Sequence, residues 1–391
     1  MLPHQLSRTA KELFASVGIL GFAISAATLF EPIYLNTLGY TFSQIVFFYV
    51  IAYALYLVLI PFGAKFVLRY GYEYGIALGS SLLIIYYLAL FGIPQLPELF
   101  YFAPVLLSFQ KIFYWMGYHG DFARSAGRKE MGRELGEISF IIGLVTIFGP
   151  IAGGAVASAF GLRLLFLFVA ILILISNIPL FRVRVHEKEK TIPYDGAFQL
   201  LKEPVHRRRF FASLGYGEDF ISAVFFPIFI YSVVQGAARV GMIVTFSSLM
   251  TALALLYMGK LTDDKNPNVI LRLGVAAKAL LWLALIPVRT AFQYFFVDAG
   301  YRIARGATEY PLLSETYNAA REDDVMKVVV LYETGLIIGK LIAMMALLVL
   351  FQTSLPVWTS MFMLGAVMSI LYAFCRHRSI SANSKEQSTK D

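Results

Sequence analysis

The chain has 391 residues, of which 58% are apolar and 15% are charged, and its formal net charge is +8. Soluble domains average about 45–50% apolar and about 25% charged residues, so this composition excludes an ordinary soluble protein and indicates a polytopic membrane protein. The single cysteine, Cys375, excludes a disulfide framework within the chain and a cysteine-based metal cluster.

Apolar stretches of about 20 residues, the length that crosses a bilayer as a helix, recur along the whole chain. Only a short segment precedes the first stretch, and no cleavable signal peptide is predicted. We therefore expect an all-α membrane protein with twelve transmembrane helices. The predicted spans are 11–37, 43–66, 74–93, 99–121, 135–160, 163–181, 209–234, 240–259, 269–288, 291–310, 326–350 and 355–375.

Lys and Arg are distributed unevenly between the two sides of these spans. The loops and tails on the side of the N-terminus hold 25 of the 33 basic residues, the opposite side holds 3, and 5 lie within spans. Because basic residues concentrate in cytoplasmic loops, both termini and the central loop are predicted to be cytoplasmic, in a cell membrane. The same asymmetry accounts for the positive net charge without a nucleic-acid partner.

Three pairs of short matches indicate an internal repeat. "FEPIY" at 30–34 matches "FFPIF" at 225–229, Gly63 matches Gly259, and "EISFIIG" at 137–143 matches "ETGLIIG" at 333–339, all at offsets of 195 or 196. Two like-oriented repeats imply two pseudo-symmetric six-helix halves related by an axis along the membrane normal. The predicted divisions are an N-terminal half 1–181, a cytoplasmic linker 182–208, a C-terminal half 209–375 and a cytoplasmic tail 376–391.

Two local patterns add to this organisation. The connection after the second span holds Gly63, Arg69 and Gly71, and its counterpart in the second half holds Gly259 and Asp263. The fifth span contains "GPIAGG", with Gly149, Pro150, Gly153 and Gly154. Glycines allow helices to approach closely, and proline bends a helix.

With these patterns the chain resembles the major facilitator superfamily across nearly its whole length. The resemblance implies that the Gly63–Gly71 connection and Gly259 with Asp263 form cytoplasmic latches, although Val67 stands where the family has Asp. The glycines of the fifth span resemble the motif associated with exchangers, with Val145 at one glycine position. A tight turn is the alternative interpretation of the first pattern, and plain helix packing is the alternative for the glycines of the fifth span.

The resemblance also implies that the first and fourth helices of each half line a central cavity. Ionisable groups within spans cost about 2.5–3.5 kcal/mol each on insertion scales and normally face a cavity or a partner. Most of those in this chain fall on the four cavity helices. The candidate substrate and proton site is Glu31, Lys111, Tyr114, Glu218, Asp219, Asp298, Arg302 and Arg305.

Asp298, Arg302, Arg305 and Glu309 follow one another at spacings of four, three and four, so they form one stripe on a helix face. This stripe either faces substrate or neutralises itself through i,i+4 pairs. Lys111 has no local acid, so its partner is expected on another helix, with Glu31, Glu218 and Asp219 as candidates. Lys278 and Lys340 lie off the cavity helices, and for Lys340 snorkelling or a helix–helix bond is expected.

These features predict a secondary active transporter that moves a small polar, anionic or zwitterionic solute by alternating access. No G-x-x-x-x-G-K-[ST] run is present in the sequence, so a gradient or the solute itself must supply the energy. A buried carboxylate, Glu31 or Glu218, is the candidate proton carrier, and efflux by antiport is also open.

The alternatives to a transporter are a membrane-embedded enzyme and a receptor or scaffold. The enzyme needs a metal-ligand cluster, whereas the five histidines are scattered and "TDDKN" has no second acidic cluster. The receptor would require a sizeable extramembrane domain. We expect a monomer in the lipid bilayer without cofactor or metal.

The charge asymmetry predicts the topology. In a Cys375→Ser background, Ser381→Cys should resist membrane-impermeant thiol reagents added outside whole cells, and a cysteine in the 94–98 loop should react. The opposite labelling pattern would reverse the orientation.

Overall fold

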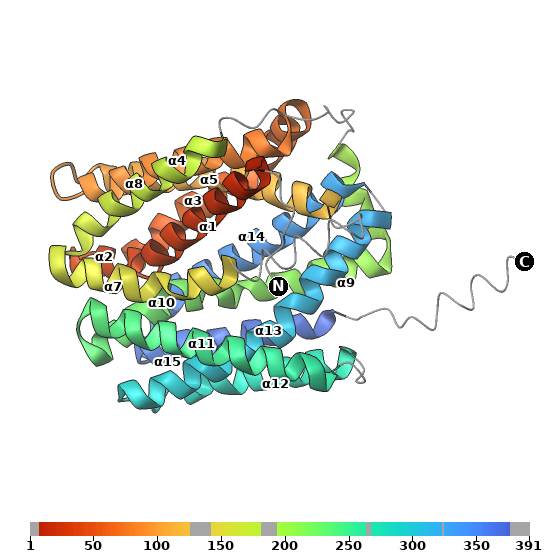
Figure 1. The fold of residues 1–391 in the computed structure, drawn as a ribbon. Coiled ribbons are helices and arrows are strands. Elements are labelled where there is room, and N and C mark those ends of the chain that lie inside the picture. Colours follow the sequence, from red (N-terminus) through yellow and green to blue (C-terminus); the bar gives the residue numbers. More distant parts are fainter. Residues whose placement is uncertain (1–7, 126–141, 181–193, 263–266, 323, 376–391) are drawn as a thin grey trace, which may run out of the picture.

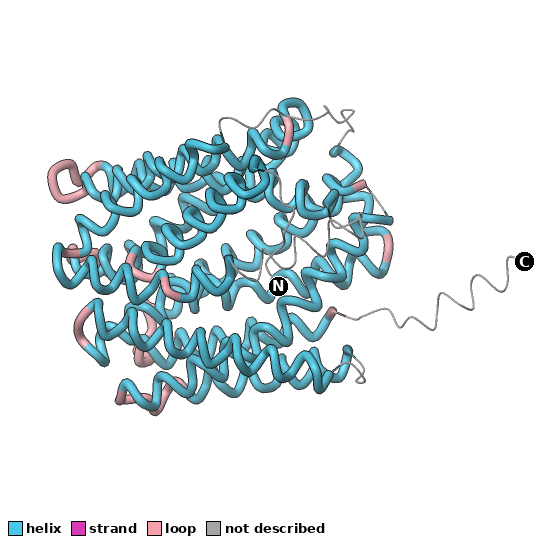
Figure 2. The backbone as a smooth tube through the Cα atoms, viewed as in Figure 1, coloured by secondary structure: helices cyan, strands magenta, loops and turns pink. Residues whose placement is uncertain are grey.

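The computed structural model describes residues 8–125, 142–180, 194–262, 267–322 and 324–375. Within these ranges every regular element is a helix, and short loops and turns join the helices (Figure 2). The predicted all-α fold is therefore confirmed.

The first half runs from α1 to α8. Its helices are α1 (Arg8–Thr28), α2 (Glu31–Thr37), α3 (Phe42–Tyr70), α4 (Tyr72–Gly92), α5 (Leu99–Ser125), α7 (Gly149–Phe160) and α8 (Leu162–Leu180). A further helical stretch, residues 142–147, precedes α7.

The second half follows a short 3₁₀ segment. Its elements are η1 (Tyr194–Lys202), α9 (Pro204–Ser213), η2 (Leu214–Tyr216), α10 (Gly217–Val234), α11 (Ala237–Thr262), α12 (Pro267–Ala284), α13 (Ala291–Glu322), α14 (Val325–Leu350), α15 (Val357–Ile370) and η3 (Leu371–Phe374).

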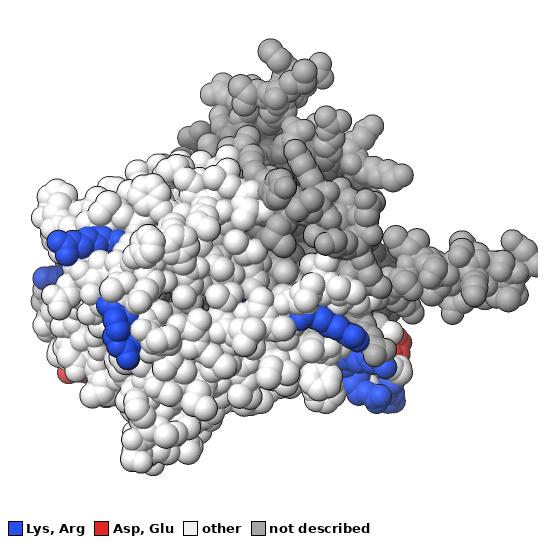
Figure 3. All heavy atoms as spheres, turned by 90° about the horizontal axis from the view of Figure 1, so that it is seen from below, with Lys and Arg blue, Asp and Glu red and all other residues white. Residues whose placement is uncertain are grey.

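Among the described residues, nine helical segments are long and apolar enough to cross a membrane, and Leu162–Ile178 is a shorter apolar helix. The two other predicted spans coincide with α12 and α13, which are helical but carry several charges. Large apolar side chains cover the outside of the bundle; Val58 and Phe292, for example, are each 72% exposed. The face seen in Figure 3 is largely uncharged, with Lys and Arg toward its two ends, as expected for a lipid-facing surface.

Glycine and proline determine where the helices break. Gly71 adopts φ +108°, which favours glycine, and so allows α3 to turn directly into α4. Pro32 lies in the first turn of α2, where a proline without an N–H is tolerated, and Pro150 has the same position in α7. The bend predicted at Pro150 is thus present as the start of a new helix.

The helices of the two halves form two groups that lie one above the other in Figure 1, with their long axes roughly parallel. Two helix pairs make the most extensive contacts between the halves: α7 packs against α11, and α3 packs against α14. Smaller contacts join α2 to α10 and α5 to α13 and α14. The second and eighth predicted spans are α3 and α11, and the fifth and eleventh are α7 and α14. Under the predicted repeat the second span corresponds to the eighth, and the fifth corresponds to the eleventh. The α7–α11 and α3–α14 contacts are therefore equivalent, which is what a pseudo-two-fold axis requires.

Part of the predicted linker 182–208 is structured. Residues 181–193 lie outside the described ranges, but η1 packs against α14 and buries Ala197 completely, and α9 begins at Pro204, before the expected 209. The connection between the halves therefore adheres to the second half.

Candidate functional site

Among the described residues, the most deeply buried ion pair joins α10 to α12. Glu218 and Lys278 have no exposed side-chain surface, and their Oε1 and Nζ atoms lie 2.5 Å apart. Trp282 Nε1 and Tyr301 OH also donate to Glu218, over 3.1 and 2.7 Å. A carboxylate with three donors is well compensated even away from water.

This pair continues into a chain of alternating charges. Lys278 Nζ also lies 3.2 Å from Glu309, whose other oxygen lies 2.9 Å from Arg305 Nε. The Arg305 guanidinium lies 2.5 Å from Asp219, and the second oxygen of Asp219 lies 2.6 Å from Lys340 Nζ. Three acids and three bases on α10, α12, α13 and α14 thus form one network with no net charge.

The network corrects the expectation for two lysines. Lys278 and Lys340 lie off the predicted cavity helices, yet they supply two of the three cations, and for Lys340 the helix–helix bond is the arrangement found. The resemblance assigns the cavity to the first and fourth helices of each half, and this left both lysines outside the candidate site. Their charges within apolar helices were the signal for a partner on another helix.

The charged stripe of α13 contains both i,i+4 pairs that its spacing allows. Arg302 Nε lies 2.8 Å from Asp298, which also accepts a hydrogen bond from Ser247, and Arg305 pairs with Glu309. The self-paired geometry is thus present, but Arg305 additionally reaches Asp219. The Arg302 and Arg305 side chains remain 33% and 39% exposed, so both side chains combine pairing with accessible surface.

Lys111 on α5 does not have the acidic partner expected for it. Among the described residues no carboxylate lies within 4.0 Å of its ammonium, so direct pairing with Glu31, Glu218 or Asp219 is wrong. Its Nζ lies 5.3 Å from the centre of the Tyr53 ring, and Lys340 Nζ lies at the same distance from that ring. One tyrosine of the first half is therefore approached by a cation from each half.

Glu31 is held differently from Glu218. It is 7% exposed at the start of α2, and the hydroxyls of Tyr86 and Tyr87 donate to its two oxygens over 3.0 and 2.9 Å. Across the described residues no cation lies within ion-pair distance of it; the Lys111 ammonium acts on it only as a more distant charge. Glu31 is thus a buried carboxylate with neutral donors.

Tyr114 makes its contacts within α5 and with α4. It stacks with Tyr118 and meets Trp115 edge-on, and its backbone approaches Gly79 of α4 closely. Its predicted place in the site is not supported by these contacts, which make Tyr114 part of the α4–α5 packing.

The motif residues are mainly packing positions. Gly63 lets α3 approach Ile112 of α5, and Arg69 lies over the ring of Tyr70. Gly259 falls within α11, and Asp263 lies outside the described residues.

The glycines of the fifth span face two neighbours. Added Cβ atoms on Gly149 and Gly153 would overlap α1, and one on Gly154 would overlap Ala237 of α11. Plain packing, including packing between the halves, explains why small residues stand here.

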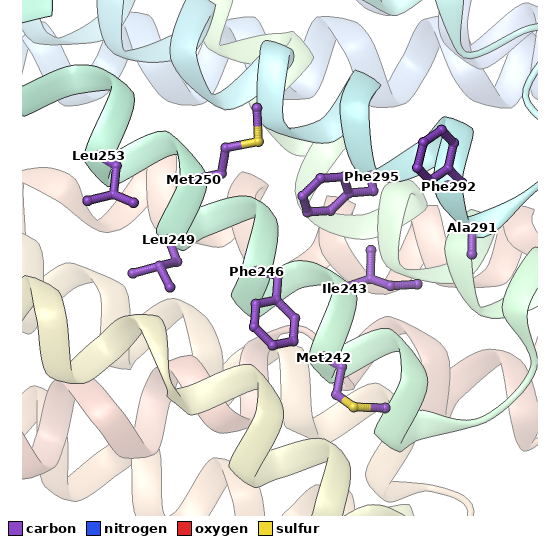
Figure 4. A pocket seen from close by; sticks show the side chains of 9 residues that line it. All are labelled: Met242, Ile243, Phe246, Leu249, Met250, Leu253, Ala291, Phe292 and Phe295. Atoms are coloured by element: carbon purple, nitrogen blue, oxygen red, sulfur yellow. The ribbon is translucent and has the colours of Figure 1, made fainter. Parts of the chain in front are cut away.

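One groove on the bundle is unsuited to a polar solute. It has a volume of about 630 Å³ between α11 and α13, and apolar side chains surround it (Figure 4). Its lining is Met242, Ile243, Phe246, Leu249, Met250, Leu253, Ala291, Phe292 and Phe295. It lies on the apolar outer surface, where lipid chains fit and charged solutes do not.

A family model of the Major Facilitator Superfamily matches residues 13–304, about three quarters of the chain. The chain belongs to the Major Facilitator Superfamily. Membership makes it a multi-pass membrane transporter of small solutes and not an enzyme.

Solved structures agree with this fold. The crystal structure of nucleoside transporter NupG superimposes with a TM-score of 0.69 at 14% identity, over 94% of this chain and 98% of that one. A mutant of NupG gives a TM-score of 0.68 at 14% identity, over 93% and 98%. No curated protein matches the sequence.

The Glu218–Lys278 pair should behave as a unit. Lys278→Met leaves Glu218 as an uncompensated buried charge and should lower the free energy of unfolding by about 3–5 kcal/mol. The double variant Lys278→Met/Glu218→Gln should recover most of that loss, measured as thermal unfolding in detergent. A double variant no more stable than Lys278→Met would show that the two residues are not coupled.

Proposed function

We propose that the protein is a proton-coupled secondary transporter that carries a small anionic or zwitterionic solute through the seam between its halves. The observation that carries this proposal is Lys111, a cation within the bundle that has no carboxylate partner among the described residues. Lys111 is half-buried. A cation that is partly removed from water is stabilised by an anion at close range, and a solute carboxylate or phosphate supplies one.

The charges of the second half support this choice of solute. The six-member network is neutral, and the Asp298–Arg302 pair is neutral as well. Lys111 is therefore the cation of this region that lacks an ion pair among the described residues, and its Nζ and that of Lys340 each lie 5.3 Å from the centre of the Tyr53 ring. Arg302 and Arg305, with their accessible surface, are the candidate contacts for the rest of a zwitterionic or polar solute.

Glu31 is a better candidate proton carrier than Glu218. Glu218 is sealed against Lys278 with no exposed surface, so a proton would have to displace a buried ion pair. Glu31 is held by two tyrosine hydroxyls, which can stay in place when the carboxyl gains a proton.

This arrangement gives a mechanism for coupling. Ionised Glu31 competes with a solute anion for the field of Lys111, and protonated Glu31 does not. Proton binding at Glu31 should therefore strengthen anion binding at Lys111, so both move in the same direction. Because proton binding strengthens anion binding, the coupling favours symport over efflux by antiport. The predicted cytoplasmic termini define which side of the membrane is the inside.

The likeness to NupG carries the fold and not the solute, because the two chains are 14% identical. A nucleoside has no negative charge to place beside Lys111. An organic anion fits this chain better.

Lys111→Ala should abolish solute transport while the protein still folds. In proteoliposomes screened with radiolabelled small carboxylates and phosphates, uptake by this variant should fall at least about tenfold, as expected when one charge-assisted contact of about 1.5–3 kcal/mol is lost. Lys202→Ala removes an exposed cation from η1 and is the matched control, with unchanged uptake. Normal uptake by Lys111→Ala would remove Lys111 from the solute site.

Glu31→Gln should separate exchange from accumulation. The amide resembles the protonated carboxyl: its oxygen can accept from one of the hydroxyls of Tyr86 and Tyr87, and its NH2 group can donate to the other hydroxyl oxygen. Exchange of internal for external solute should therefore continue. Accumulation driven by an inward proton gradient should be lost, since the side chain can no longer bind and release a proton. Glu98→Gln, which changes an exposed acid in the loop between α4 and α5, should leave both unchanged. Gradient-driven accumulation by Glu31→Gln would place the proton elsewhere.

A further inference from the structure

A second polar cluster joins the two halves one turn along α3 from Tyr53. Its centre is Glu333 on α14, whose Oε1 lies 3.0 Å from His119 Nε2 of α5. Tyr56 of α3 donates its hydroxyl to Oε2 over 2.9 Å. The other ring nitrogen of His119 is hydrogen-bonded to Tyr317 of α13 over 2.8 Å. All three contacts therefore cross from the first half to the second.

The cluster is almost completely removed from water. Tyr56 and Glu333 are 1% and 2% exposed, and His119 and Tyr317 are 7% and 8% exposed. His119 also stacks on Trp115 and meets Tyr332 edge-on, so its ring is fixed from both halves. Hydrogen bonds to a charged group are strong at such a site, and a partner left without its bond is costly.

The cluster lies toward one end of the bundle. His119 is near the end of α5, Tyr317 is near the end of α13, and Glu333 follows the start of α14. This is the end that the distribution of Lys and Arg predicts to be cytoplasmic.

The opposite end of the seam is closed by different chemistry. There Phe42 of α3 packs against Phe225 of α10 and Trp358 of α15. Ala238 of α11 donates its backbone N–H to Ser158 of α7, beside the close approach of Gly154. The seam is thus mainly apolar at this end and held by a buried carboxylate at the other.

We propose that Glu333, Tyr56, His119 and Tyr317 form the gate that closes the predicted cytoplasmic end, and we call this cluster the Glu333 latch. Opening that end must separate α3 and α5 from α13 and α14, and this breaks all three cross-half contacts at once. Water then solvates the freed carboxylate and imidazole, so the latch opens reversibly and does not have to unfold any helix.

The latch requires two halves that move, and it does not depend on which solute is carried. It assigns a role to four residues outside the proposed solute site. Its test is therefore made on the protein without solute, so that failure of the anion proposal and failure of the latch give separate results.

The experiment measures the distance between the halves at the latch end. Spin labels on Tyr74→Cys and Arg208→Cys, both exposed, report that distance in a Cys375→Ser background by pulsed electron resonance. Glu333→Gln should raise the ratio of the long-distance to the short-distance population about tenfold, which corresponds to about 1.4 kcal/mol.

Glu315→Gln is the matched control. Glu315 is also a buried acid near this end, and it pairs with Arg209 over 3.0 Å, but both residues belong to the second half. Its loss should leave the distance distribution unchanged. An unchanged distribution in Glu333→Gln, or an equal shift in Glu315→Gln, would overturn the proposal.

Two milder variants keep the test decisive should Glu333→Gln fail to fold. Tyr56→Phe removes a single hydroxyl, and His119→Phe keeps a stacked ring while removing both ring nitrogens. Each should shift the population in the same direction as Glu333→Gln, with the larger shift in His119→Phe because it breaks two contacts. Distributions identical to the parent in both variants would refute the latch.

Discussion

The cost of placing charge away from water is the constraint on which the interior of this protein depends. A charged side chain within a span must meet an opposite charge or accessible water, since lipid offers neither. The second half meets this condition with three acids and three bases that alternate from Glu218 to Lys340. Because each member touches the next, four helices are held at one relative rotation.

The first half follows the same rule with far fewer groups. Glu31 relies on two tyrosine hydroxyls, and Lys111 relies on the Tyr53 ring. These two groups are the least compensated charges of the site, so their state responds most to a proton or an anion. In the proposed mechanism the second half therefore provides a fixed electrostatic frame, and the first half holds the groups that change.

The seam between the halves must be both close and separable. Small residues such as Gly154 and Gly241 let α7 and α11 approach through their backbones, without interlocking side chains. Aromatic contacts around Phe42 and the polar contacts of Glu333 close its two ends. Contacts of these kinds can be broken and re-formed without unfolding a helix, as alternating access requires.

The sequence by itself determined the membrane class, the positions of the spans, the resemblance to the family and the spacing that allows the i,i+4 pairs of α13. Each of these follows from hydropathy or from the 3.6-residue period of one helix, which are local properties. The tertiary structure decided that Lys278 and Lys340 join the network, that Tyr114 faces α4, and that Glu333 bridges the halves. Lys340 and Asp219 are 121 residues apart, and they meet only because of the rotation and depth at which α10 and α14 pack. Those two quantities depend on the shapes of all neighbouring helices together, so no single stretch of sequence contains them.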